Sequence, residues 1–386
     1  MSEAIAGPLQ GVRILEMAGL GALPFFGMLL ADMGADILTI APPRSRENSV
    51  PESRESYQRD PVWRGRTRME LDLKAPSAVE HVLRMMENVD VVVEAFRPGV
   101  MERLGLGPTL CLAQNPRLVY GRMTGWGQDG PLSQIPGHDA NYLAITGALH
   151  SIGYPDRAPV PPLNLVGDLG GGALYLAIGV LAGLLHARQT GRGQVVDAAM
   201  VDGANSLMTQ FYGMRAVGRW DDTRRANAIG GGAPYSTVYK TLDQKYVAVV
   251  AVEEKFYEVL LIKLGLSRND IPNRADRAQW PALRSLFEEI FETKTRDEWA
   301  RLLEYEEGCV SPILDMGEAP LHPHSIARNA FQMMDGNPIP AAAPRFLGTP
   351  TQHAPKNIGS AIVLLSNWGV SSTTIDALVA IDQAIP

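Results

Sequence analysis

The sequence predicts an α/β protein with a large Rossmann-like parallel-sheet domain and a smaller α+β domain. In the first half of the chain, short β-branched runs alternate with helical patterns. That order is typical of right-handed βαβ units, which build a mostly parallel sheet. From about residue 230 the alternation gives way to a hairpin pattern followed by helices. The length of 386 residues also exceeds what one hydrophobic core usually supports, so two domains are expected.

The elements of the large domain follow one another in a regular order. The expected strands are Val12–Leu15, Ile37–Ile40, Val89–Val93 and Leu118–Tyr120, and the expected helices include Phe25–Asp32, Ser77–Glu87 and a long one from Asp168 to about Arg188. Ligands of parallel sheets bind beyond the carboxyl ends of the strands. The segments that hold Glu16, Arg44, Arg97 and Arg122 follow strands, so we expect them to border the ligand site.

The small domain is expected to begin with a hairpin made by Tyr235–Tyr239 and Tyr246–Val250. The stretch 253–305 then reads as helices, and a last helix covers Thr373–Ala384. The predicted boundaries are 1–190 for the large domain, joined by a C-terminal return over 330–386, and 225–320 for the small domain, with linkers at 190–225 and 320–330.

Composition narrows the class of protein. The formal net charge of -7 argues against a nucleic-acid partner. Two cysteines, Cys111 and Cys309, provide no disulfide framework and suit a reducing cytosol. The N-terminus lacks the pattern of a secretory signal, and the longest apolar stretch, Ala173–Leu185, is shorter than the roughly 20 residues that a membrane span needs. We therefore expect a cytoplasmic protein with no membrane partner.

His138 and Asp168 are the candidate acid/base residues. His138 lies in a turn between Gly137 and Asp139, where a histidine is either a structural hydrogen-bonding residue or a proton carrier. Asp168 precedes three glycines at the start of the long helix, where an aspartate serves as an N-cap or as a catalyst. Glycine is a poor helix former, so the three glycines suggest that something approaches the backbone there, an anionic oxygen being one candidate.

Glu253 is a third candidate, at the end of a predicted strand. Its alternative role is a solvated helix start, where acidic side chains are favoured in any case. An imidazole, an opposing carboxyl and an orienting carboxylate together suit reversible proton transfer at a carbon beside a carbonyl.

Other motifs exclude common cofactors. Gly230–Gly232 is not followed by Lys-Ser/Thr, so it is not a phosphate-binding P-loop. No Gly-x-Gly-x-x-Gly follows the first strand, which argues against a nicotinamide or flavin dinucleotide. His322 and His324 lack a second cluster of ligands, so no metal is expected. The sequence therefore predicts an enzyme without a cofactor.

Several longer motifs resemble a known family. They are Leu29–Asp36, Phe96–Val100 and Gly125–Pro131, together with Gly137–Tyr142, Pro162–Asp168 and Gly193–Gly203. The first three resemble the class III (CaiB/BaiF-type) CoA-transferase family, and the last three resemble its α-methylacyl-CoA racemase branch. The likeness runs from Pro8 almost to the C-terminus.

The resemblance implies an interlocked homodimer whose active site lies between the large domain of one subunit and the small domain of the other. It implies His138 and Asp168 as the acid/base pair, with Glu253 hydrogen-bonded to His138 across the interface. The substrate would be an acyl-CoA thioester, whose CoA is part of the substrate and not a cofactor. The predicted substrate or CoA contacts are Arg44, Arg64, Arg66, Arg97, Gly137, Asp139 and Tyr142. The start of the Asp168 helix is the expected donor to the enolate oxygen.

One departure from the family pattern concerns the second strand. The family usually has a basic residue and an acidic residue where this chain has Thr39 and Ala41. Because the basic residue normally helps to hold CoA phosphates, arginines of neighbouring loops would have to replace it. Those arginines are Arg44, Arg46, Arg64, Arg66, Arg68 and Arg97, and their alternative role is ordinary surface charge.

Three functions remain open at this stage. The first is a racemase that interconverts (2R)- and (2S)-2-methylacyl-CoA by 1,1-proton transfer through an enolate. The second is a CoA transferase that uses Asp168 as a nucleophile. The third is an inactive CoA-ester binder. The sequence does not identify the acyl group, and methionines such as Met17, Met200, Met208 and Met214 either line an apolar pocket or belong to the core.

Overall fold

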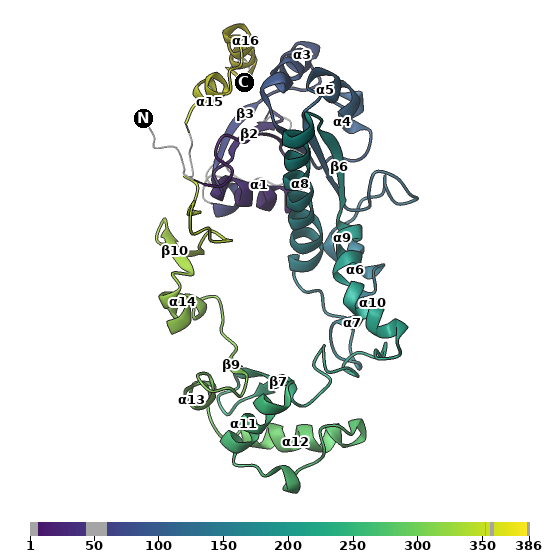
Figure 1. The fold of residues 1–386 in the computed structure, drawn as a ribbon, viewed down its shortest axis with the longest axis vertical. Coiled ribbons are helices and arrows are strands. Elements are labelled where there is room, and N and C mark those ends of the chain that lie inside the picture. The colour runs from purple at the N-terminus through teal and green to yellow at the C-terminus, as the bar shows by residue number, and fades with distance from the viewer. Residues whose placement is uncertain (1–6, 44–59, 352, 356–358, 384–386) are drawn as a thin grey trace. The chain divides into compact units, whose positions relative to one another are not determined.

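The computed structural model describes residues 7–43, 60–351, 353–355 and 359–383 (Figure 1). The chain divides into two units. Unit 1 comprises Met1–Thr146, Leu163–Leu207 and Asn329–Pro386, and unit 2 comprises Gly147–Pro162 and Met208–Arg328. The division differs from the predicted boundaries in one main respect: the segment Gly147–Pro162 belongs to unit 2 and interrupts unit 1.

Unit 1 is built on a six-stranded parallel sheet with the order β3-β2-β1-β4-β5-β6. The strands are β1 Arg13–Met17, β2 Asp36–Ala41, β3 Arg66–Glu70, β4 Val91–Glu94, β5 Val119–Thr124 and β6 Gln194–Ala199. Four of these match the predicted apolar runs. The sequence analysis missed β3 and β6, which carry charged residues and lack a continuous β-branched run.

The side chains of the sheet divide between two cores. Ile14 and Ile37 belong to one cluster, while their neighbours Leu15 and Leu38 belong to the other. This period of two means that the sheet is buried on both faces, as parallel sheets usually are. Helices α1 and α8 cover the first face, and α3, α15 and α16 cover the second (Figure 1).

Unit 1 also contains α-helices. They are α1 Ala22–Asp32, α3 Pro76–Met85, α4 Val100–Arg103, α5 Pro108–Gln114, α6 Asp139–Ala144, α8 Tyr175–Thr190, α9 Met200–Leu207, α15 Ala361–Asn367 and α16 Ser372–Gln383. A short antiparallel hairpin, β10 Phe331–Met334 and β11 Asn337–Pro340, also belongs to this unit.

The long helix begins earlier than predicted and begins as a π-helix, η4, over Leu165–Leu174. It continues directly into α8, so that Leu165–Thr190 forms 26 helical residues that are long and apolar enough, by length and composition, to cross a membrane. The prediction that this stretch is too short for a membrane span therefore does not hold on length. A core helix of a soluble protein passes the same test, and 39% of the apolar window is buried inside the protein.

Unit 2 contains a three-stranded antiparallel sheet in the order β7-β8-β9. Its strands are β7 Ser236–Lys240, β8 Tyr246–Val250 and β9 Val310–Pro312, and its helices are α7 Ala148–Ser151, α10 Thr209–Ala216, α11 Glu254–Leu264, α12 Trp280–Phe291, α13 Arg296–Leu303 and α14 Pro323–Ala327. The predicted hairpin is present within one residue of its expected bounds. Aromatic stacking of Tyr239 on Phe291, with ring centroids 5.0 Å apart, lies at the centre of its core.

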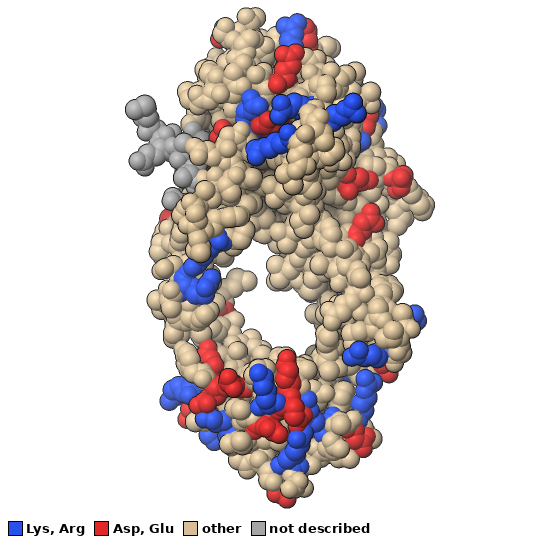
Figure 2. Space-filling model, in the orientation of Figure 1, with Lys and Arg blue, Asp and Glu red and all other residues tan. Residues whose placement is uncertain are grey.

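The surface of unit 2 carries charges of both signs. Over the part of the molecule that holds α12 and α13, Figure 2 shows Lys and Arg side chains intermixed with Asp and Glu. Such mixing gives no extended positive surface on this face, in line with the negative net charge.

Candidate active site

His138 is presented at the start of α6. Its backbone is extended, and its N–H donates to Asn141 Oδ1 at 3.0 Å, which closes the first turn of the helix. The His138 side chain is exposed to solvent. An exposed imidazole on a fixed turn is free to exchange a proton with a bound molecule.

Gly137 and Tyr142 shape the turn before His138. The Tyr142 hydroxyl donates to the Gly137 carbonyl, and its ring packs edge-on against Trp126 with centroids 4.8 Å apart. A Cβ at Gly137 would lie 2.8 Å from the Tyr142 ring, so only glycine fits. Both residues therefore hold the turn in this chain, and their predicted contact with substrate stays a prediction.

Asp139 joins α6 to the start of η4. The backbone N–H of Asp168 donates to Asp139 Oδ1 at 2.7 Å, a bond between residues 29 positions apart. The Asp139 side chain packs so closely on Gly167 that a Cβ there would lie 2.8 Å from its carboxyl carbon. The structure thereby brings His138 and Asp168, on neighbouring segments, to one place in unit 1.

The Asp168 carboxyl is half-buried, and its pKa is raised. Burial is the first cause, the negative charge of Asp139 is the second, and a hydrogen bond to Asn164 and the charge of His138 oppose them. Its Oδ2 would lie 3.6 Å from a Cβ at Gly21, so the carboxyl faces the start of α1. The raised pKa favours the acid form of this carboxyl.

The glycines after Asp168 have a different purpose from the one expected. A Cβ at Gly171 would lie 2.8 Å from the backbone nitrogen of Ala204 and 2.9 Å from the Met200 carbonyl oxygen, both on α9. What approaches this backbone is therefore α9. The Asp168 amide is also occupied by Asp139, so the prediction that the start of this helix supplies the enolate donor is wrong for that amide.

The arginines predicted to bind CoA divide into two groups. Arg64 forms two hydrogen bonds to Asp32, with Nε 2.8 Å from Oδ1, and Arg66 binds Glu16, with Nε 2.9 Å from Oε1. All four side chains are 3% exposed or less, so in this conformation neither guanidinium is offered to a phosphate. Arg44 lies outside the described residues.

Thr39 belongs to the same buried system. Its hydroxyl donates to Glu16 Oε1 at 3.1 Å, beside the Arg66 pair. The residue that departs from the family pattern therefore completes an internal hydrogen-bond network.

Arg97 is exposed, and hydrogen bonds of neighbouring residues fix the loop that carries it. Glu94, at the end of β4, accepts the Phe96 N–H at 2.7 Å and the Arg122 Nε–H at 2.9 Å. Arg122 also binds Glu102 on α4, with Nη1 2.8 Å from Oε1. One guanidinium therefore fixes both ends of the loop that carries Arg97.

Glu253 lies at the start of α11 in unit 2 and is exposed. Its predicted hydrogen bond to His138 of a second chain stays a prediction.

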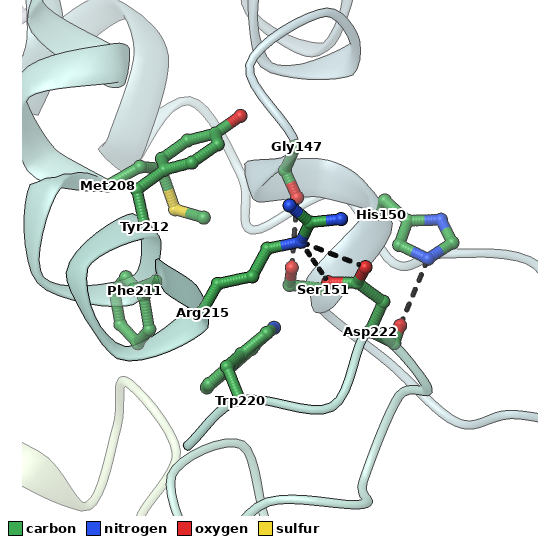
Figure 3. A pocket seen from close by; sticks show the side chains of 9 residues that line it. All are labelled: Gly147, His150, Ser151, Met208, Phe211, Tyr212, Arg215, Trp220 and Asp222. Atoms are coloured by element: carbon green, nitrogen blue, oxygen red, sulfur yellow. Dashed lines mark hydrogen bonds and ion pairs between the residues drawn. The ribbon is translucent and has the colours of Figure 1, made fainter. Parts of the chain in front are cut away.

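Unit 2 also contains an open cavity of about 300 Å³ (Figure 3). The Phe211 and Trp220 rings form part of its wall at a centroid distance of 5.2 Å, and Arg215 pairs with Asp222 at 3.1 Å. Among the four methionines proposed for an apolar pocket, Met208 lines this cavity, whereas Met17 is fully buried in the core of unit 1.

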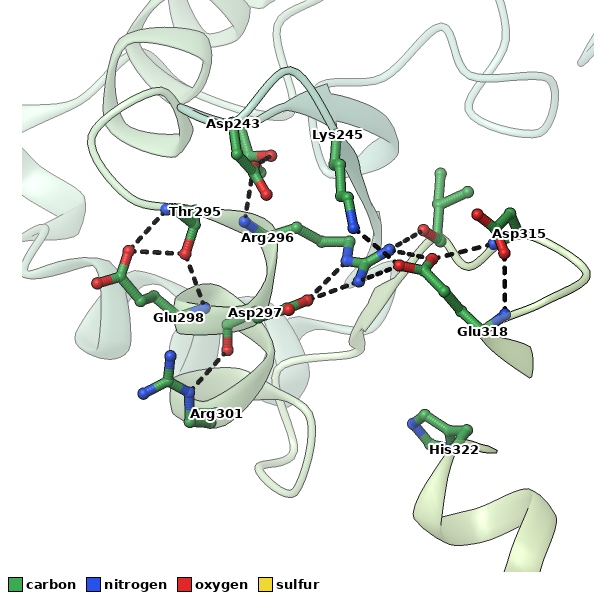
Figure 4. Close-up of polar contacts among 12 residues, drawn as sticks. Asp243, Lys245, Thr295, Arg296, Asp297, Glu298, Arg301, Asp315, Glu318 and His322 are labelled. Atoms are coloured by element: carbon green, nitrogen blue, oxygen red, sulfur yellow. Dashed lines mark hydrogen bonds and ion pairs between the residues drawn. The ribbon is translucent and has the colours of Figure 1, made fainter. Parts of the chain in front are cut away.

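A network of ion pairs surrounds Arg296 in unit 2 (Figure 4). Its guanidinium binds both oxygens of Glu318, at 2.6 and 2.9 Å, and also Asp297, while Lys245 binds Glu318 at 2.8 Å. His322 pairs with Glu304 at 2.5 Å. Within residues 7–43, 60–351, 353–355 and 359–383, no three His, Cys, Asp or Glu side chains are grouped so that they could hold a metal ion.

Comparison with known proteins decides the family. The pattern of CoA-transferase family III matches residues 9–357. The chain belongs to CoA-transferase family III.

Two kinds of relative of this CoA-transferase family III enzyme are well matched. It is 40% identical over 347 residues to the alpha-methylacyl-CoA racemase of Mus musculus, covering 90% of this chain and 88% of the relative. It is 31% identical over 322 residues to a probable fatty acyl-CoA transferase of Mycobacterium tuberculosis, covering 78% of this chain and 80% of that one.

Solved structures share the fold. A CaiB/BaiF family protein from Brucella suis superposes with a TM-score of 0.78 at 24% identity, covering 94% of this chain and all of that one. The structure of Rv3272 from M. tuberculosis gives a TM-score of 0.74 at 27% identity, covering 91% of this chain and 96% of the other. The family implies an acyl-CoA substrate.

Proposed function

We propose that this enzyme is an α-methylacyl-CoA racemase, which interconverts (2R)- and (2S)-2-methylacyl-CoA thioesters without a cofactor. The observation that carries the proposal is the pairing of an exposed imidazole, His138, with a half-buried carboxyl of raised pKa, Asp168. The 40% identity to a protein named alpha-methylacyl-CoA racemase supports it.

The chemistry needs one proton carrier on each face of a planar intermediate. In one direction neutral His138 removes the C2 proton and the protonated Asp168 delivers a proton to the opposite face. In the other direction the two residues exchange roles. The raised pKa of Asp168 keeps a fraction of this carboxyl in the acid form that delivery requires.

The enolate oxygen needs hydrogen-bond donors that are in place before the proton leaves. Asp139 and Ala140 are the first two residues of α6 and directly follow His138. At the N-terminus of a helix, the backbone N–H groups lack acceptors within the helix. We assign the donor role to this turn instead of the start of η4.

We further propose that the enzyme works as an interlocked cytoplasmic homodimer, in which Glu253 of a second chain orients His138. Exposed apolar side chains on α8 support the proposal of a dimer, since Ile178 is 63% exposed and Leu185 is 59% exposed. Exposed side chains of this kind are usually covered in an assembly.

The second candidate is a CoA transferase with Asp168 as the nucleophile. The similarity to a probable fatty acyl-CoA transferase favours it. A nucleophilic carboxylate must be ionised, however, and the raised pKa of Asp168 opposes ionisation. An inactive CoA-ester binder is the third candidate and leaves the paired acid/base groups without a purpose.

One assay separates the three candidates. The enzyme is incubated with a single enantiomer of a 2-methylacyl-CoA in heavy water, without an acceptor acid. Deuterium at C2 together with loss of optical purity supports the racemase. Turnover that requires an added carboxylate acceptor supports the transferase and contradicts the proposal, as does the absence of both reactions.

A further inference from the structure

We propose that Asp139 is a positioning residue whose buried carboxylate holds the Asp168 backbone and, as a like charge beside it, keeps the Asp168 carboxyl in its acid form. The inference rests on the proposed function, in which Asp168 donates a proton. The Asp139 carboxylate touches no reacting atom; only the Asp139 backbone amide is assigned to the enolate oxygen.

The geometry ties the two aspartates together. Asp139 Oδ1 accepts the Asp168 N–H at 2.7 Å. The Asp139 residue is only 8% exposed. Gly167 permits this approach, because a side chain there would collide with the Asp139 carboxyl group. The contact therefore depends on a glycine next to the proton donor.

The second oxygen of Asp139 has no partner. Its Oδ2 is buried and makes no hydrogen bond within the described part of the chain. Negative charge on a buried carboxylate that has no donor at one oxygen is weakly screened by its surroundings. That charge is the second cause, after burial, of the raised pKa of Asp168.

The other groups that face Asp168 do not cancel this charge. Asn164 hydrogen-bonds the carboxyl, and His138 is the group beside it that can carry a positive charge. Tyr142 on α6 is neutral, and its own pKa is raised by burial and by both aspartates. Helix α1 carries one ionisable residue, Asp32, at its far end, where Arg64 neutralises it.

The remaining elements packed against η4 carry mostly acidic or neutral groups near it in the described part of the chain. α9 contributes Asp202 and β6 contributes Asp197, which interact with each other. The cation of β5, Arg122, is paired with two glutamates. Among the described residues that act on Asp168 by charge, Asp139 favours its protonated form and His138 opposes it.

The substitution Asp139→Asn isolates the charge. An asparagine side chain retains an oxygen that accepts the Asp168 N–H, so the backbone contact is preserved while the negative charge is removed. The matched control is Asp197→Asn, because Asp197 likewise accepts a backbone amide, from Gln128 at 3.2 Å, although its side chain is exposed. Neither substitution changes the volume of the side chain appreciably.

The measurement is a carbon-13 titration of protein labelled at the aspartate side-chain carboxyl, with the Asp168 signal assigned by its loss in Asp168→Asn. We expect the Asp168 midpoint to fall in Asp139→Asn and to stay at the wild-type value in Asp197→Asn. A fall of one pH unit lowers the protonated fraction by about tenfold at higher pH. The high-pH limb of the racemisation profile should move down by the same interval, with KM for the acyl-CoA within about threefold.

An unchanged Asp168 midpoint in folded Asp139→Asn overturns the inference, and so does an equal shift in the Asp197→Asn control. The titration requires no turnover, so it separates this inference from the proposed function. Absence of C2 exchange in the wild type contradicts the racemase proposal, whereas a lowered Asp168 midpoint still supports the role of Asp139.

Discussion

Two half-buried carboxylates, Asp168 in unit 1 and Glu318 in unit 2, have opposite surroundings. In unit 1, Asp139 and Asp168 lie beside each other, and burial and like charge raise the pKa of Asp168. In unit 2, Glu318 binds Arg296 and Lys245, and these bonds hold the pKa of Glu318 well below its usual range (Figure 4). The same functional group has a raised pKa in one place and a lowered pKa in the other.

The difference shows what to expect from each carboxylate when it is removed. A carboxylate that is paired with cations contributes stability. A like charge next to a carboxyl raises its pKa, and the repulsion between the two ionised groups lowers the stability of the folded state. Substitutions of Asp168 and Glu318 should therefore have effects of opposite sign on stability and of very different size on activity.

The largest effect is expected at the acid. Asp168→Asn removes the proton carrier on one face, so racemisation should fall by roughly 10²- to 10⁴-fold. The rate is measured by loss of optical purity, with Asp197→Asn as the matched control. A loss of less than tenfold in a folded variant would remove Asp168 from the mechanism.

The next effect concerns stability in unit 1. Asp32→Asn leaves Arg64 buried without its carboxylate, which should lower the free energy of unfolding by about 3–5 kcal/mol. Denaturant unfolding measures the change. Equal stability of the variant and the wild type would show that this buried pair does not stabilise unit 1.

Arg97 provides the corresponding test of substrate binding. Arg97→Ala should raise KM for the acyl-CoA by about tenfold to a hundredfold, as expected for one lost charged hydrogen bond, with an unchanged thermal midpoint. Exposed Arg103→Ala, on α4, is the control. An unchanged KM for Arg97→Ala would shift the phosphate contact to other residues, such as Arg44.

The Arg296 network predicts an acid-sensitive unit 2. Because the pKa of Glu318 is lower in the folded state than its ordinary value of 4.5, its contribution is fully present above that pH and is lost as the pH falls below it. In Glu318→Gln this loss should disappear, so that the thermal midpoint depends less on pH below 4.5. A variant that keeps the wild-type pH dependence contradicts the assignment.

The smallest effect has the opposite sign. Because the pKa of Asp168 is raised in the folded state, ionisation penalises folding as the pH rises above 3.8 and through the folded pKa. Asp168→Asn should therefore raise the thermal midpoint slightly at pH 8 and leave it unchanged near pH 3. Calorimetry at the two pH values measures the difference, and a lower midpoint at pH 8 would contradict the comparison.

The sequence was informative where a residue type strongly prefers one kind of secondary structure. Runs such as Val91–Val93 predicted buried parallel strands. The residues around His138 and Asp168 marked two segments that the structure joins by a hydrogen bond. The sequence did not show which charged residues are buried. Arg66 on β3 looks like a surface residue until Glu16 and Thr39 are known to surround it. The contact of Asp139 with the Asp168 amide was also missed, although Gly167 beside Asp168 was a usable signal of close approach.

The central claim is that His138 and Asp168 act on opposite faces of the acyl-CoA enolate. It is tested most directly by incubating His138→Ala and Asp168→Asn separately with each pure enantiomer of a 2-methylacyl-CoA in heavy water. Each variant keeps one base, so each should exchange the C2 proton of one enantiomer only, without racemisation, and the two variants should select opposite enantiomers. Exchange of both enantiomers by either variant, or selection of the same enantiomer by both, would contradict the account.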